Sequence, residues 1–384
     1  MKTNETLLRP GRSVLALLAL LAVLVALGST PAAAQQDEES IFRLLTFQTT
    51  GELRLGATEG NGQKEIVDIH NAILALKAIH ASEVANLAYI PADMRSLIEV
   101  GDSAVNGVKS VYRAALAHKA DGSLTDRGGD YRVFYPSTSV RIKTPITNPH
   151  KMFGIAGNYF RPGGPMENPP PIERSAASES EGLGRQADRG RPSPFLKSVA
   201  GLVGPDDEIV MTDLLLDGYP STHEAEFAYI ISKRAKNVSA ADAMDYVFGY
   251  TVHNDVSGRT LQTGASGSEG SSMTKGMDTF APTGPYITLK EDVPDPYNLA
   301  IETKLNGEVF EMDNANTKYM RHKIPAQIEL ISHIMTLEPG DIIATGVPQP
   351  TAQLEAGDTV EIRIQRLGTL RNFVVKNPTN RTSD

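Results

Sequence analysis

The 384-residue sequence contains no cysteine. This absence excludes structural disulfides, thiolate metal sites, a cysteine nucleophile and a lipid-anchored leader. The folded state must therefore be stabilised by its core alone. A hydrophobic content of 40% in a chain of this length is enough for a sizeable core and for two domains.

The sequence also lacks an excess of basic residues. Its formal net charge is −9 at pH 7, and no basic stripe is interleaved with aromatic residues. These properties argue against a nucleic-acid-binding protein and favour small molecules as partners.

Only one long apolar run is present, and it lies near the amino terminus. Basic residues precede the apolar stretch 14–27, and Ala32–Ala34 supplies small residues for cleavage. The run is shorter than the roughly 20 residues that a membrane-spanning helix needs, so a membrane anchor is the less favoured alternative. We predict a signal peptide over residues 1–34, cleavage near Ala34, and an exported protein, periplasmic or secreted, with no stable membrane anchor.

Residues 35–148 are predicted to form a small amino-terminal α+β domain. Residues 41–56 alternate around a Thr-Gly turn and predict a hairpin, and the apolar spacing over 68–79 and 105–115 predicts two helices. Residues 131–142 predict strands again. No catalytic constellation is visible in this part of the sequence.

A stretch rich in proline, glycine, serine and charged residues, 161–192, shows neither helical nor strand periodicity. A loop of this length inside a compact domain is usually functional or disordered. We therefore predict a lid or flexible loop, within a catalytic domain that spans residues 149–376 and precedes a loose tail, 377–384.

Three acids carry the strongest chemical signal. If 223–231 is a strand, Glu224 and Glu226 point to the same face, because side chains alternate along a strand. Neighbouring carboxylates repel each other, and they tolerate partial burial best when a hard cation lies between them. Asp255 follows the apolar run 246–252 and offers a third acid. Solvated surface acids are the alternative for each residue taken singly.

The rest of the catalytic domain is predicted to be mostly strands. Residues 239–247 begin with a serine followed three residues later by an aspartate, which predicts a short capped helix. An Asn-Gly turn within 300–310 predicts a hairpin, and 324–336 predicts an amphipathic helix with proline in its first turn. Strands are expected at 248–254, 342–345 and 360–367, the last of which should close the domain.

Six short motifs follow one another along this part of the chain. They are Gly154–Tyr159, Glu224-Ala225-Glu226, the segment 246–262, Lys275 with Asp278-Thr279-Phe280, Asn306-Gly307-Glu308, and Pro339–Gly346. In this order and at this spacing they resemble the fumarylacetoacetate hydrolase family. The resemblance covers residues 149–373 and, more loosely, the amino-terminal unit. It implies an α+β, β-rich fold, a mixed β-sandwich roll with a lid over a metal, and commonly a homodimer.

Members of this family are metal-dependent enzymes that act on 2-oxo acids or 1,3-dicarbonyls. The resemblance implies that Glu224, Glu226 and Asp255 bind Mg²⁺, with Mn²⁺ or Ca²⁺ as alternatives, since an all-oxygen site suits these hard cations. A substrate that chelates the cation through its 2-oxo group would react through a metal-stabilised enolate. Carbon–carbon cleavage, decarboxylation, tautomerisation and hydration all share this intermediate.

Further positions match the family's substrate site. Lys275 matches a catalytic lysine beside the metal, where an ammonium group stabilises enolate charge or holds a carboxylate; a surface lysine is the alternative. Arg259 and Gln262 match positions that line the cavity, and a guanidinium fork suits a carboxylate. The remaining matches are Thr345 and Gly346, which contact substrate oxygen, and Tyr159 and Lys197, which are lid-contact or core positions.

The sequence departs from the family pattern after Tyr159. Many hydrolytic and decarboxylating members carry a lid histidine and, three residues later, a glutamate, which together activate water. Here these positions fall on Pro162 and Pro165. A glutamate from within the lid, Glu167, Glu173, Glu179 or Glu181, is the predicted replacement for the base. Glu167 is named as the catalytic residue, and a solvated loop acid is the alternative for each.

The leading prediction is a metal-dependent hydrolase or lyase that acts on carbon–carbon bonds of a small 2-oxo acid or 1,3-dicarbonyl, such as an acylpyruvate. The alternatives among enzymes are an isomerase or hydratase, which needs no lid dyad, and a decarboxylase. A third hypothesis is a non-catalytic protein that binds oxo acids through a metal. The intact Lys275 favours an enzyme, whereas the missing dyad favours binding.

Overall fold

The computed structural model of the protein describes residues 38, 40–60, 65–128, 131–160, 190–212, 221–258, 273–310, 315–348 and 351–376. All elements given below belong to one compact unit, Ile41–Asp384. The predicted signal peptide, most of the predicted lid and the tail lie outside the described residues, as do Glu167, Arg259 and Gln262. Within the described ranges, no helix combines the length and apolar character needed to cross a membrane.

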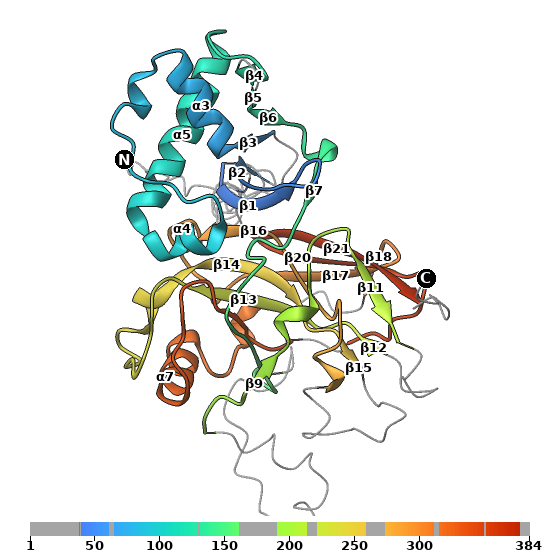
Figure 1. The fold of residues 1–384 in the computed structure, drawn as a ribbon. Helices are drawn as coiled ribbons and strands as arrows, with labels where there is room; N and C mark the ends of the chain where they lie inside the picture. The colour runs from blue at the N-terminus through green and yellow to red at the C-terminus, as the bar shows by residue number, and fades with distance from the viewer. Residues whose placement is uncertain are drawn as a thin grey trace, which may run out of the picture. The chain divides into compact units, whose positions relative to one another are not determined.

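Twelve strands form one large sheet (Figure 1). In spatial order its main path is β6 (Phe134–Tyr135), β3 (Ile66–Asp68), β2 (Leu53–Glu59), β1 (Phe42–Gln48), β16 (Ala281–Leu289), β14 (Val247–Asn254), β13 (Ala225–Ile231), β19 (Ile342–Ala344), β8 (Met152–Ile155) and β9 (Pro194–Lys197). In addition, β7 (Arg141–Ile142) pairs with β1 and β10 (Leu202–Val203) pairs with β16. Strands from both sides of the boundary predicted near residue 148 therefore share this sheet.

A second sheet of five strands shares a core with the large one. Its order is β11 (Glu208–Met211), β21 (Gly368–Lys376), β20 (Thr359–Ile364), β17 (Ile301–Leu305) and β18 (Glu308–Val309). Two short pairs complete the strands: β12 (Ser221–Thr222) with β15 (Ser257–Gly258), and β4 (Arg127–Gly128) with β5 (Tyr131–Arg132). Buried apolar residues of both sheets, such as Phe227, Ile343 and Ile362, belong to one cluster. The fold is therefore β-rich α+β with a mixed sandwich, as predicted.

Four α-helices are described: α3 (Ile69–Ala78), α4 (Met94–Val100), α5 (Asp102–Ala120) and α7 (Ile324–Ile334). Asp68 caps α3, because its side chain accepts a hydrogen bond from the Asn71 N–H. Apolar residues of α3, α4 and α5 form a second buried cluster with β1, β2 and β13, whereas α7 packs into the cluster between the sheets.

Strand β13 lies between these two clusters. Ala228 and Ile230 belong to the helix-side cluster, whereas Phe227 and Tyr229 belong to the cluster between the sheets. The alternation predicted for this segment is confirmed, and every residue of the strand is buried. The acids at the start of β13 are thus held by a backbone that is packed on both faces.

Most predicted elements are present near their expected positions. The hairpin of 41–56 is β1 and β2, and the hairpin of 300–310 turns at Asn306 and Gly307, whose φ angles of 55° and 83° are those of an Asn-Gly hairpin turn. The helices expected at 68–79, 105–115 and 324–336 are α3, α5 and α7.

Two predictions about secondary structure are wrong. The helix expected over 239–247 is only a 3₁₀ turn, Ala243–Tyr246, although the predicted cap forms: the Asp242 N–H donates to Ser239 Oγ (3.3 Å), which donates to Asp242 Oδ2 (2.7 Å). The strand at 360–367 does not close the domain. The chain reverses through Arg366, with a φ of 67°, and Gly368, with a φ of 100°, into the additional strand β21.

Candidate metal centre

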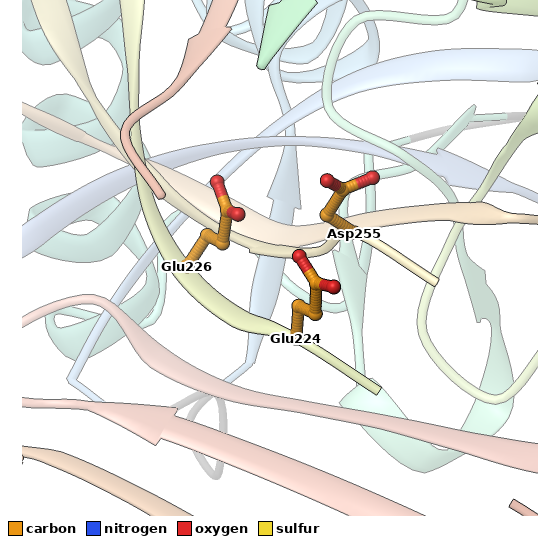
Figure 2. A group of neighbouring side chains, drawn as sticks. All are labelled: Glu224, Glu226 and Asp255. Atoms are coloured by element: carbon orange, nitrogen blue, oxygen red, sulfur yellow. The ribbon is translucent and has the colours of Figure 1, made fainter. Parts of the chain in front are cut away.

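Three carboxylates converge where β13 begins and β14 ends (Figure 2). Glu226 lies in β13, Glu224 just before it, and Asp255 directly after β14. The Asp255 N–H donates to the Glu224 carbonyl oxygen (3.0 Å), so the antiparallel register places these two acids opposite each other. One oxygen atom from each carboxylate lies within 4.8 Å of the others.

The cluster is buried, and Glu226 is its least compensated member. Glu226 is 2% exposed and Asp255 1% exposed. Burial, together with the negative charges of Asp255 and Glu224, raises the pKa of Glu226 well above its usual value. The Gly346 N–H donates to Glu226 Oε2 (2.8 Å), but in the described part of the chain no cationic side chain lies within ion-pair distance of Glu226.

Two lysines compensate the other two acids. Lys275 Nζ donates to Asp255 Oδ2 (2.5 Å) and to Glu224 Oε2 (3.1 Å), and Lys197 Nζ lies 2.6 Å from Asp255 Oδ1. Burial alone would raise the pKa of Asp255, but the two ammonium groups outweigh it and hold the pKa well below its usual value. Asp255 is therefore an anion.

The two lysines differ in their own titration. Burial acts to lower the pKa of Lys275, but Asp255 and Glu224 outweigh it, and the pKa of Lys275 is raised. Lys275 is therefore a permanent cation of the cluster. The Lys197 side chain is fully buried, and burial lowers its pKa although Asp255 opposes the shift. Lys197 Nζ also donates to the Lys275 carbonyl oxygen (2.7 Å), and this hydrogen bond helps to position the backbone at Lys275.

Ser257 is a residue of this cluster that the sequence reasoning missed. Its Oγ donates to Glu224 Oε1 (3.1 Å) and accepts from Lys275 Nζ (2.6 Å). Ser257 lies two positions after Asp255, and this spacing in an extended segment was the available signal.

The predicted substrate residues Tyr159, Thr345 and Gly346 lie beside Glu226. Thr345 Oγ1 donates to the Phe227 carbonyl oxygen (2.7 Å), so in its 3.0 Å bond with the Tyr159 hydroxyl group the tyrosine is the donor. The next residue, Gly346, supplies the N–H that holds Glu226. In the described structure these residues fix the ligand set, and their contact with substrate stays a prediction. The roles of Glu167, Arg259 and Gln262 lie outside the described residues.

The donor set fits a hard divalent cation. All three side chains are carboxylates, which suit Mg²⁺, Mn²⁺ or Ca²⁺. Glu226 is buried beside two other acids, and among the described residues no cationic side chain lies within ion-pair distance of it. A dication held by Glu224, Glu226 and Asp255 would remove the repulsion that raises the pKa of Glu226.

A comparison with known families agrees with this geometry. Residues 167–375 match the model of the fumarylacetoacetate (FAA) hydrolase C-terminal family. The chain belongs to this family. Among relatives of this FAA hydrolase family protein is the mitochondrial oxaloacetate tautomerase fahd2 of Xenopus laevis, which is 33% identical over 293 residues, covering 74% of the present chain and 79% of the relative.

Solved structures with the same fold include enzymes of different reaction types. One is a maleylpyruvate hydrolase from Sphingobium sp. SYK-6 in complex with manganese(II) and pyruvate (TM-score 0.60, 28% identity, covering 87% of the present chain and 99% of the other). Another is a 2-hydroxyhepta-2,4-diene-1,7-dioate isomerase from Mycobacterium marinum (TM-score 0.59, 28% identity, covering 88% and 100%). The relatives of this FAA hydrolase family protein thus include a tautomerase, an isomerase and a hydrolase.

Proposed function

We propose that this protein is a divalent-metal-dependent enzyme that moves a proton next to the carbonyl group of a small 2-oxo acid, as a tautomerase or isomerase does. The observation that carries the proposal is the buried group of Glu224, Glu226 and Asp255, whose ligand oxygens lie within 4.8 Å of one another. When bound there, Mg²⁺ or Mn²⁺ would polarise the 2-oxo group of a substrate and stabilise negative charge on its oxygen.

The charges around the site support an anionic substrate. Lys275 is held protonated by Asp255 and Glu224, so it supplies positive charge to a substrate carboxylate rather than acting as a base. Because the Lys275 side chain is 17% exposed whereas that of Lys197 is fully buried, Lys275 is the lysine that a substrate would meet. Glu167 remains the predicted general base.

Two observations support proton transfer ahead of carbon–carbon cleavage, which the sequence alone placed first. The positions of the water-activating dyad are occupied by Pro162 and Pro165. The relative from Xenopus laevis is an oxaloacetate tautomerase. Carbon–carbon hydrolysis is the second candidate, supported by the fold shared with maleylpyruvate hydrolase.

Stopped-flow absorbance spectroscopy of oxaloacetate tests the proposal directly. Metal-stripped protein is reloaded with one equivalent of Mn²⁺ and freed of excess metal, because free divalent ions themselves promote enolisation. The exchange between enol and keto forms is followed by absorbance, and pyruvate release from an acylpyruvate is followed in parallel. Glu226→Gln, treated identically, is the control for residual metal.

Each outcome separates one hypothesis from the others. Faster enol–keto exchange without carbon–carbon cleavage supports the proposal. Pyruvate release from the acylpyruvate would instead support the hydrolase. Saturable binding of both compounds with no turnover of either would contradict an enzyme and favour the oxo-acid-binding protein.

We further propose that the mature protein is exported and forms a homodimer. The apolar stretch 14–27 and the small residues Ala32–Ala34 support export. Amino-terminal sequencing of protein expressed in a bacterial host should find a start near Gln35. An intact amino terminus in the cytoplasmic fraction would contradict export, and light scattering of the mature chain measures the oligomer.

A further inference from the structure

A large cavity lies apart from the carboxylate cluster and shares none of its residues. It has a volume of about 1070 Å³ and is bordered by the turn between β1 and β2, the short pair β4–β5, and the segment Ser137–Ser139. A cavity of this size is in the range that accommodates a small organic ligand. Its most unusual lining residues are four arginines: Arg54, Arg127, Arg132 and Arg141.

Two of these arginines are already neutralised by buried acids. Arg54 Nε donates to Asp68 Oδ2 (2.8 Å), and Asp68 is 1% exposed. Arg141 pairs with Asp207, which is 5% exposed. These pairs build the wall of the cavity and leave little charge for a ligand.

The two acids that line the cavity are also engaged. Glu52 accepts from Arg54 Nη1 (3.3 Å), and Asp206 accepts from Arg371 Nε (2.6 Å). Neither acid forms an ion pair with Arg127 or Arg132 in the described part of the chain.

Arg127 and Arg132 face each other, and among the described residues no carboxylate is in ion-pair contact with either; Asp126, which pairs with Lys119, acts on Arg132 only at longer range. They are direct partners in the antiparallel pair β4–β5, so their Cβ atoms lie roughly 4.5–5.5 Å apart. Both line the cavity, hence both side chains are on the same face of the pair. Within the described residues neither forms an ion pair, and like charges directly opposite each other are destabilising.

The surroundings hold Arg132 in place and leave part of it available. Its backbone carbonyl oxygen accepts from Asn71 Nδ2 (2.8 Å), its Nε donates to the Phe134 carbonyl oxygen (3.1 Å), and its guanidinium carbon lies 4.7 Å from the centre of the Tyr135 ring. The two terminal nitrogens have no hydrogen-bond partner among the described residues. A guanidinium group fixed in this way presents two parallel donors, which suits an oxyanion.

We propose that Arg127 and Arg132 form a binding site for a small polyanion, a molecule that carries two or more phosphate or carboxylate groups. An oxyanion between the two guanidinium groups would turn their repulsion into attraction. The hydroxyl-bearing side chains of Thr49, Thr50 and Ser137 line the same cavity and offer further donors to a second oxyanion group. This site requires no metal.

Isothermal titration calorimetry tests the site with pyrophosphate and with citrate as probes. The protein is stripped of metal beforehand, so that neither probe binds through a cation at the carboxylate cluster, and the buffer contains about 50 mM salt to limit screening. The full-length protein should bind one equivalent of a probe. Preference for pyrophosphate indicates a phosphate ligand, and preference for citrate indicates a polycarboxylate.

Variants locate the binding. Arg127→Gln and Arg132→Gln should each weaken binding at least tenfold, whereas Arg113→Gln, which removes an exposed charge of α5 outside the cavity, should change it less than twofold. Arg132→Lys keeps the positive charge but loses the paired donors of the guanidinium group, and it should bind the probe more tightly than Arg132→Gln does. Equal affinity in all variants, or no saturable binding of either probe, would overturn the proposal.

A second measurement needs no ligand. Because Arg127 is exposed, lies opposite Arg132 and forms no ion pair with any described residue, Arg127→Gln should raise the melting temperature of the ligand-free protein by about 1 °C. A lower melting temperature would mean that Arg127 stabilises the folded chain by itself, which would contradict the unpaired state on which the site depends.

Discussion

Like charges face each other both in the carboxylate cluster and in the strand pair β4–β5, and the two cases differ in burial. Glu226 and Asp255 are at most 2% exposed; Glu226 lies in β13 and Asp255 directly follows β14, two strands whose residues are all buried. Arg127 is exposed and belongs to a strand of two residues. Buried like charges need a compensating cation, whereas water screens the arginines.

The magnitudes follow from this difference. Removing one partner of a buried ion pair typically costs about 3–5 kcal/mol, whereas a cross-strand pair of like charges on a surface costs about 0.2–1 kcal/mol. The acidic cluster therefore needs cationic partners, and two lysines from distant segments, Lys197 and Lys275, form ion pairs with Asp255. The arginine pair is tolerated without such partners.

The largest effect is expected from Glu226→Gln. The amide keeps the size of the side chain but removes one of three negative charges, so metal affinity should fall by at least about 100-fold. Metal analysis after gel filtration measures it, with Glu208→Gln on the exposed part of β11 as control. An unchanged metal content in Glu226→Gln would refute the ligand assignment.

Replacement of Lys197 tests how much its buried ion pair with Asp255 contributes to the free energy of unfolding. Lys197→Met leaves Asp255 with Lys275 alone, and the free energy of unfolding should fall by about 3–5 kcal/mol. Urea denaturation measures it. Lys304→Met is the matched control, because Lys304 pairs with Glu302 on the surface (3.6 Å) and should contribute less than about 1 kcal/mol. Equal losses of unfolding free energy in the two variants would show that burial does not make the Lys197 ion pair more stabilising than the Lys304 ion pair.

Addition of a metal should stabilise the acidic cluster specifically. At 100 times its dissociation constant Mn²⁺ contributes about 2.7 kcal/mol of folding free energy, which corresponds to a rise of about 5 °C in melting temperature. Differential scanning calorimetry measures it. A rise of the same size in Glu226→Gln would assign the binding to another site.

The smallest effect in the metal centre is expected from Tyr159→Phe. The change removes the hydrogen bond from the hydroxyl group to Thr345 Oγ1, and the free energy of unfolding should fall by about 1 kcal/mol. Urea denaturation checks this value against Tyr89→Phe, since Tyr89 is 76% exposed. No loss in Tyr159→Phe would mean that water replaces the bond.

The sequence predicts local features of the site better than its long-range contacts. The common face of Glu224 and Glu226 follows from strand periodicity alone. The fully buried pair of Lys197 with Asp255 does not, because it depends on the pairing of β9 with β8, and nothing local to Lys197 encodes that pairing. Strand β21 was not predicted either, because the turn before it depends on Arg366. This residue adopts a left-handed conformation, which an arginine in the sequence does not indicate.

The hydrogen bond from the Gly346 N–H to Glu226 has a consequence for how this site can evolve. Apart from proline, no residue exchanged at position 346 removes this main-chain donor, so the path of the backbone itself orients Glu226. That path admits only glycine, because Gly346 has a φ of 97° and an added Cβ would lie 2.8 Å from the Ile155 carbonyl oxygen. Substitutions of the side chains around the three carboxylates would therefore leave this contact of Glu226 in place.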